Sequence, residues 1–282
     1  MINYYLLTKP GIIVGNLLTV AAGFLIASHH SFNVLLFAAT LLGLAFIMAS
    51  ACIFNNFIDR KIDQKMNRTK NRALAKGLIS GQKAILFASL LGSLGILILL
   101  YYTNGLATLI ALFGFFVYVV LYSMWKGRTI YGTAIGSIAG AVPPVVGYCA
   151  VSHQFDMGAV ILFTMLVLWQ MPHFFAIAIV HFEDYAAASI SVFPVIKGMR
   201  QTKLHMMLYT IGFLIAATLL ATFKFAGQLY FFAALILGLA WILLSLLGFK
   251  NKNDKLWAKQ MFRLSLIIIT ILCLVIPIER VL

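Results

Sequence analysis

Charged residues are rare in this sequence, and acidic residues are the rarest of them. Of its 282 residues, 10% are charged and only 7 are Asp or Glu, whereas 63% are hydrophobic. A soluble domain is roughly a quarter charged, and a soluble fold leaves too much of its chain on the surface to hide so much apolar area from water. The composition therefore excludes an ordinary soluble domain and predicts that lipid surrounds most of the chain.

Cysteine is also rare, and its placement excludes a disulfide framework. The three cysteines, Cys52, Cys149 and Cys273, all lie inside apolar runs, and no two of them have the spacing of a metal site. We expect them to be small, buried side chains.

Nine apolar runs are long enough to cross a membrane as helices, which takes about 20 residues each. The N-terminal residues carry neither a basic segment nor a cleavage site, so the first run is expected to stay as a helix. The sequence thus predicts an all-α polytopic membrane protein whose helices form one domain, residues 1–282, around a central cavity. A duplication of helices 1–4 as helices 5–8 is a further hypothesis. The runs are residues 11–28, 34–57, 84–102, 105–124, 131–151, 158–181, 205–225, 228–248 and 263–279.

The 21 Lys and Arg residues gather on one side of this arrangement. All of them except Lys224 and Arg280 fall before the first helix or in the connections on the same side as the N-terminus. Because Lys and Arg accumulate in cytoplasmic loops, we predict that the N-terminus is cytoplasmic and the C-terminus is outside. The net charge of +14 then reflects topology and an attraction for anionic lipid or substrate, and it requires no nucleic-acid partner.

Four of the seven acids form two pairs on that basic side. Asn55, Asp59 and Asp63 are spaced four residues apart, so they share one face if the second helix continues past the membrane. Like charges at this spacing disfavour a helix unless a divalent cation lies between them, and Mg²⁺ prefers carboxylates together with substrate phosphates. The second pair, Glu183 and Asp184, follows the sixth helix. The alternative is that each pair belongs to a solvated turn at a helix end.

These residues resemble the N-x-x-x-D-x-x-x-D signature that intramembrane aromatic prenyltransferases carry after their second helix. Within that superfamily the chain is similar to the protohaem IX farnesyltransferases, from about residue 5 to about residue 205. It departs from them at Ala73 and Ser191, where proline is common, and in splitting Lys126 from Arg128 by one glycine. The matching stretches are Leu7–Pro10 with Asn16, Asn55–Arg72, Tyr131–Gly147, Trp169–His173 and Asp184–Gly198.

The resemblance implies that farnesyl diphosphate, protohaem IX and water give haem O and diphosphate. It implies Mg²⁺ as the cofactor and a metal set that also forms the catalytic centre: Asn55, Asp59, Asp63, Glu183 and, chiefly, Asp184. Basic side chains would stabilise the leaving diphosphate. These are Arg68, Arg72, Lys126, Arg128, Lys197 and Lys9, with Asn16 as a further candidate.

Histidines and tyrosines supply candidates for the rest of this chemistry. His173, a polar residue within a membrane span, and His181, near the second acidic pair, are candidate haem ligands, the alternative being hydrogen-bonded helix histidines. Tyr118, Tyr122 and Tyr148 are candidates for stabilising an allylic cation with their rings, the alternative being packing or interfacial tyrosines.

Three other functions are compatible with the sequence. One is a non-catalytic haem or lipid chaperone, which would bind haem but have no use for the paired aspartates. A prenyltransferase of the same superfamily with a quinone-precursor acceptor would share the metal chemistry, and only its acceptor pocket would differ. A membrane transporter would place its ionisable residues near the middle of the bilayer, whereas these acids are predicted at helix ends. The resemblance further implies a bacterial inner-membrane location and haem-copper oxidase assembly proteins as partners.

Overall fold

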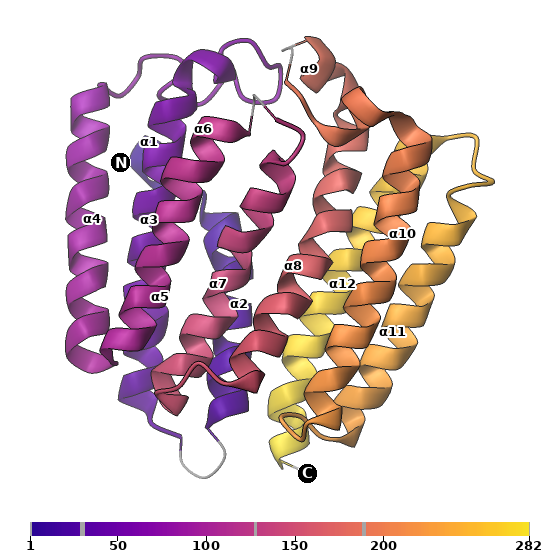
Figure 1. The fold of residues 1–282 in the computed structure, drawn as a ribbon. Helices are drawn as coiled ribbons and strands as arrows, with labels where there is room; N and C mark the ends of the chain where they lie inside the picture. Colours follow the sequence, from indigo (N-terminus) through magenta and orange to yellow (C-terminus); the bar gives the residue numbers. More distant parts are fainter. Residues whose placement is uncertain (1, 29–31, 127–128, 188–189, 282) are drawn as a thin grey trace.

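The computed structural model describes residues 2–28, 32–126, 129–187 and 190–281, and the chain within those ranges is helical (Figure 1). The π-helix η1 continues α5 into α6, so these three form one span. The elements are α1 (Ile2–Leu7), α2 (Pro10–Ala27), α3 (Val34–Asp63), α4 (Gly81–Tyr102), α5 (Gly105–Phe116), η1 (Val117–Tyr122), α6 (Ser123–Trp125), α7 (Gly132–Ser152), α8 (Met157–Val180), α9 (Phe182–Ala187), α10 (Phe193–Thr222), α11 (Gln228–Leu247) and α12 (Asp254–Val281).

Within the described ranges, nine helical spans are long and apolar enough to cross a membrane, which confirms the predicted number. Three of them, α3, α10 and α12, extend beyond the predicted runs. Hydropathy marks the part of a helix that lies in lipid, whereas the helical hydrogen-bond ladder continues into polar sequence outside it. Helix α10 begins twelve residues earlier than predicted and accommodates this with a non-helical residue, Gly198, at φ 78°.

Short polar residues fix the first turns of several spans. Asn33 Oδ1 accepts a hydrogen bond from the Leu36 amide at 3.0 Å, and Asn104 Oδ1 accepts one from the Ala107 amide at 2.8 Å. These caps satisfy amides that have no partner inside the helix. The polar residues between the apolar runs therefore determine where these spans begin.

Close backbone contact between α2 and α7 holds the centre of the bundle. A Cβ atom added at Gly23 would lie 2.0 Å from the carbonyl oxygen of Pro144, and one added at Gly147 would lie 2.1 Å from that of Val20. Glycine is thus required at both positions, because any side chain would separate the helices. Elsewhere α3 packs along α4, and α8 packs along α10 and α12.

The connections gather at two ends of the bundle (Figure 1). The basic end, uppermost in Figure 1, is where α3, α6 and α8 finish, and the far end is where α7 and α10 finish. The basic connections do share one end, as the sequence predicted; that this end is cytoplasmic stays a prediction. Between α2, α7, α8 and α12 the interior holds a cavity of about 20 Å³.

Candidate functional site

Helix α3 continues to Asp63, which places Asn55, Asp59 and Asp63 on one face at its end. All three face the protein interior: their exposed fractions are 2%, 4% and 4%. Carboxylates are rarely so buried unless cations or hydrogen-bond donors accompany them. The sequence spacing therefore produces a compact anionic strip, and its partners decide what it can do.

Lysines from two other elements contact this strip. Lys9 Nζ, just before α2, donates a hydrogen bond to Asn55 Oδ1 at 2.7 Å, and Lys126, just after α6, forms an ion pair with Asp59. Asn55 in turn donates from Nδ2 to Ser123 Oγ at 3.0 Å. Lys9 and Lys126, both predicted to bind diphosphate, therefore each contact a predicted metal ligand.

Lys9 is held in an unfavourable environment. Its backbone adopts φ 55° and ψ 61°, a left-handed conformation that costs a non-glycine residue about 1–2 kcal/mol. Burial lowers the pKa of Lys9 to about 8, because removal from water disfavours the ammonium. Backbone strain of this kind concentrates at functional sites.

One oxygen of Asp59 is left without a partner. Lys126 contacts Asp59 Oδ2, whereas Oδ1 is buried and accepts no hydrogen bond from any described residue. A buried carboxylate oxygen in that state costs free energy that a cation at the same place would offset. With the amide oxygen of Asn55 one turn away, the donor set is all oxygen, which fits a hard divalent cation such as Mg²⁺.

The segment after α3 folds back over the strip and explains the spacing of its motif. Arg72 Nη1 bonds both carboxylate oxygens of Asp63, at 2.9 and 3.0 Å, and Thr69 Oγ1 donates to the Asp63 carbonyl at 3.1 Å. Met66 is buried beneath the segment. Thr69 therefore anchors this segment to the end of α3, and Arg72 brings a guanidinium to Asp63.

The π-helix η1 brings two tyrosines to the same place. Its wider turn stacks the rings of Tyr118 and Tyr122 at 5.4 Å, nearly parallel. The Tyr118 hydroxyl lies 3.4 Å from Asn55 Oδ1, and Lys126 Nζ lies 5.2 Å from the centre of the Tyr122 ring. Single π-helical turns are rare and occur mostly at functional sites. This π-helical turn was not predicted from the sequence.

The second acidic pair lies on α9, at the same end of the bundle (Figure 1). Arg68 connects the two regions, because its Nη2 lies 3.4 Å from the hydroxyl of Tyr185, the neighbour of Asp184. His181 Nδ1 lies 3.9 Å from Asp184 Oδ2. Partial burial, with the nearby Arg68 charge, lowers the pKa of His181, so its imidazole is predominantly neutral at pH 7.

The two acidic pairs remain separate in this structure. The described residues contain no group of three or more His, Cys, Asp or Glu side chains close enough to hold one metal ion. Asp184 is partly exposed and Glu183 is exposed. A single metal centre that combines Glu183 and Asp184 with Asp59 and Asp63 stays a prediction.

The three remaining acids have structural partners. Asp156 Oδ1 accepts from the Gly158 amide at 2.9 Å and caps α8. Glu279 Oε2 accepts from the Gly227 amide at 2.7 Å and caps α11. Asp254 forms an ion pair with the buried Lys203 at 2.5 Å. Within the described ranges, none of these three acids contacts a residue of the strip.

Some predicted residues lie away from the strip. Tyr148 is at the far end, about 24 Å along α7 from its first residue, and its hydroxyl donates to Asp156 at 2.9 Å; it does not accompany Tyr118 and Tyr122. Lys197 is exposed on α10, and Asn16 Nδ2 donates to the Ile12 carbonyl within α2. Arg128 lies outside the described residues.

His173 is buried in α8, between the rings of Trp169 and Phe262, each centred 4.8 Å away. Its Nδ1 lies 2.7 Å from Ser265 Oγ, and that hydroxyl donates its proton to the Phe262 carbonyl at 2.6 Å. Ser265 therefore accepts from Nδ1–H, and the lone pair of the imidazole is on Nε2. Ser265 and Ser123 are the contacts that sequence reasoning missed, since a lone serine in an apolar run carries no pattern.

This chain is similar in sequence to one known protein family and to relatives of a single name. The profile of the UbiA prenyltransferase family matches residues 16–267. A Protoheme IX farnesyltransferase of Protochlamydia amoebophila is 57% identical over the full length of both chains, and one of Photorhabdus laumondii is 49% identical over 99% of this chain and 96% of its own.

Solved structures share the fold. A digeranylgeranylglyceryl phosphate synthase superimposes with a TM-score of 0.82, at 21% identity, over 99% of this chain and 98% of its own. A UbiA homologue from Archaeoglobus fulgidus, bound to DMAPP and Mg²⁺, superimposes with a TM-score of 0.69, at 18% identity, over 97% of this chain and 98% of its own.

Proposed function

The chain belongs to the UbiA prenyltransferase family, and we propose from this that it transfers the farnesyl group of farnesyl diphosphate to a vinyl group of protohaem IX, with addition of water, giving haem O and diphosphate. The relatives that match it over nearly their whole length carry the name of that activity. The observation that carries the proposal is the buried strip of Asn55, Asp59 and Asp63, which is contacted by cations from three different segments.

The strip is suited to hold Mg²⁺ through Asn55, Asp59 and Asp63, and Asp184 and Glu183 would be further ligands from α9. The ion supplies positive charge that binds the diphosphate and stabilises it as a leaving group. Asp59 Oδ1, buried and without a partner among the described residues, is the atom that most needs such a cation. The relative from Archaeoglobus fulgidus, solved with DMAPP and Mg²⁺, has the same fold.

The basic residues on the strip would then change partners. Lys126 and Arg72, paired with Asp59 and Asp63 in this structure, are close enough to the strip to bind diphosphate oxygens once the carboxylates bind metal. Lys9 and Arg68 border the same place, and Arg128 and Lys197 are further candidates from the sequence. As the bond between the farnesyl C1 and the diphosphate oxygen breaks, its electron pair leaves with the diphosphate, whose growing charge these donors stabilise.

The farnesyl fragment left by this step is an allylic cation. The rings of Tyr118 and Tyr122 are stacked and partly buried, and Tyr118 contacts Asn55; aromatic faces attract a desolvated cation. A vinyl carbon of protohaem bonds to the cation, and water adds to the resulting cation on the haem side chain and loses a proton. Tyr148 is no longer proposed for this step, because it lies at the far end.

His173 is the proposed ligand of the haem iron, with His181 as the alternative. The hydrogen bond to Ser265 leaves Nε2 unprotonated, which is the form that binds a metal. We expect His173→Ala to abolish the Soret shift on protohaem binding and to weaken binding at least about tenfold, with a smaller effect of Ser265→Ala. His153→Ala, at the far end, is the control. An unchanged spectrum in His173→Ala would remove it as the ligand.

The remaining proposals concern location and partners. The protein is a multi-pass membrane protein, and we place it in a bacterial inner membrane with the basic end in the cytoplasm. A haem-copper oxidase assembly pathway is the proposed consumer of the product. Labelling of single cysteines placed at each end of the bundle, in intact cells, tests the orientation, and labelling of the basic end from outside would overturn it.

Turnover by the purified protein tests the proposed activity directly. Protein in nanodiscs receives protohaem, farnesyl diphosphate and Mg²⁺, and the products are identified by liquid chromatography and mass spectrometry. We expect a haem species that carries a hydroxyethylfarnesyl group and is absent when EDTA is added. Diphosphate release with an aromatic quinone precursor, and none with protohaem, would establish the other acceptor. No prenylation of either by folded protein would favour a transporter.

A further inference from the structure

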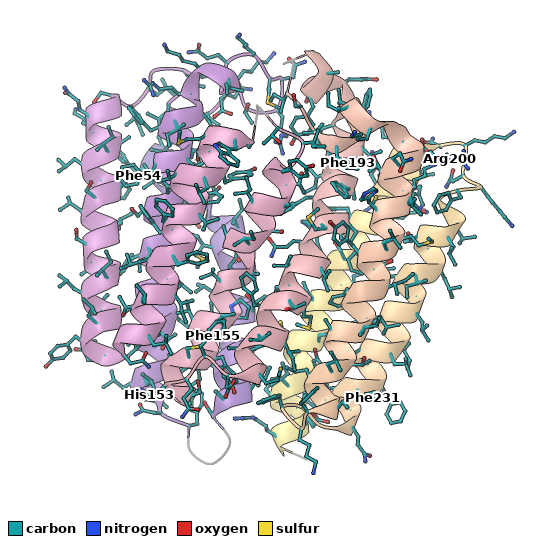
Figure 2. All side chains as sticks on the ribbon, viewed as in Figure 1. Phe54, His153, Phe155, Phe193, Arg200 and Phe231 are labelled. Atoms are coloured by element: carbon teal, nitrogen blue, oxygen red, sulfur yellow. The ribbon has the colours of Figure 1, made fainter. Side chains whose placement is uncertain are left out.

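A second cavity, independent of the acidic strip, opens at the far end of the bundle. Its volume is about 580 Å³, within the range of ligand-binding pockets, roughly 300–1,000 Å³. It lies among the ends of α2, α10, α11 and α12, where Figure 2 shows Phe231. Apolar side chains, two cations and one carboxylate line it, among them Ile26, Phe225, Ile276, Lys224, Glu279 and Arg280.

Two cations bring positive charge to this cavity. Lys224 and Arg280 are the two basic residues that the predicted topology leaves on this side of the membrane, and both line the cavity. The carboxylate of Glu279 also lines the cavity, but it accepts hydrogen bonds from the amides of Gly227 and Leu229, each at 2.7 Å. Among the described residues no carboxylate lies within ion-pair distance of Lys224 or Arg280, so the cavity has positive charge available for a ligand.

The position of Lys224 adds a second observation. It lies two residues after the end of α10, with φ 64°, and its amide donates to the Ala221 carbonyl at 2.9 Å. Glycine is the usual residue at this left-handed position after a helix, and lysine costs about 1–2 kcal/mol there. The chain thus keeps a cation at a strained position on the edge of the cavity, and such strain concentrates at binding sites.

We propose that this cavity binds the phosphate of an anionic phospholipid. The two cations can bind a phosphate, and Ile26, Phe225 and Ile276 can contact the first methylenes of the acyl chains. The opening is at the end of the membrane spans, at the depth of lipid head groups. A soluble anion would gain nothing from the apolar wall, so the lipid is the favoured occupant.

Native mass spectrometry of the delipidated protein tests this proposal with phosphatidylglycerol and phosphatidylcholine as probes. We expect one phosphatidylglycerol to be retained in preference to phosphatidylcholine. The double variant Lys224→Gln/Arg280→Gln should lower the affinity for phosphatidylglycerol at least about tenfold, since it removes two charge-assisted contacts. The control, Lys250→Gln/Lys252→Gln, removes two exposed lysines from the opposite end and should leave that affinity unchanged.

Equal retention of the two lipids would overturn the proposal, and so would an equal loss of phosphatidylglycerol affinity in the control variant. Displacement of phosphatidylglycerol by inorganic phosphate at the same concentration would also overturn it, because the cavity would then be a site for soluble anions. If the double variant does not elute as a monodisperse species, Arg280→Gln alone is compared with wild type, and an unchanged preference for phosphatidylglycerol counts against the site. Farnesyl transfer is not part of the readout, so the outcome is separate from that of the proposed activity.

Discussion

Replacing either Asp59 or Asp63 by Asn is expected to lower farnesyl transfer at least about a hundredfold, the size of effect seen when a group that stabilises developing charge is removed. Asparagine keeps the shape of the side chain but loses the charge that draws a divalent cation. The protein should still fold, because the uncharged amide is less costly to bury than a carboxylate. Turnover is measured with Mg²⁺, and binding of Mn²⁺ is followed by electron paramagnetic resonance.

The control for this pair is Asp254→Asn, which removes an acid from the same end of the bundle. Asp254 pairs with Lys203 and has no proposed contact with substrate, so turnover should remain within a few-fold of wild type while thermal stability falls. Substantial Mg²⁺-dependent turnover in both Asp59→Asn and Asp63→Asn would show that the strip does not hold the metal.

Lys126→Gln is expected to shift two affinities in opposite directions. Without diphosphate the ammonium of Lys126 competes with a divalent cation for Asp59, so its removal should strengthen Mn²⁺ binding. With the metal bound, the same ammonium is free to bind the diphosphate, so its removal should weaken binding of a non-reactive farnesyl diphosphate analogue. Each change should be about tenfold or more, because one charge-assisted contact is worth about 1.5–3 kcal/mol.

Both affinities are measured by titration calorimetry on the same preparations. Lys61→Gln serves as the control. Lys61 is exposed on α3, the helix that carries Asp59, so its replacement should change neither affinity. A purely structural role for Lys126 predicts that both affinities fall together. That result, or no change in Mn²⁺ affinity, would refute the exchange of partners.

The fold and the anionic strip could be predicted from the sequence because both depend on local pattern. Length and hydropathy of each apolar run give a span without knowledge of its neighbours. The four-residue spacing of Asn55, Asp59 and Asp63 gives a shared face as soon as helix α3 continues to Asp63. Arg68 and Arg72 could be predicted as phosphate-binding cations because they follow the acids directly in the sequence, whereas the role of Lys9 came from the resemblance.

The partners of the strip could not be predicted, because they come from distant parts of the chain. Lys126 lies 67 residues from Asp59, and Lys9 lies 46 residues from Asn55. No periodic pattern links such positions, and a basic side chain in a loop can reach many acids. The π-helix at Tyr118 and Tyr122 was also missed, because its composition is that of any apolar helix.

By itself, then, the sequence determined the membrane environment, the nine spans, the basic end and the face that carries the acids, since hydropathy and helical periodicity act over one helix at a time. Only the tertiary structure decided that Tyr148 lies away from the strip, that Ser265 sets the tautomer of His173, and that the last two cations line one cavity. Each of these depends on which helix ends meet in space, and packing between spans fixes that.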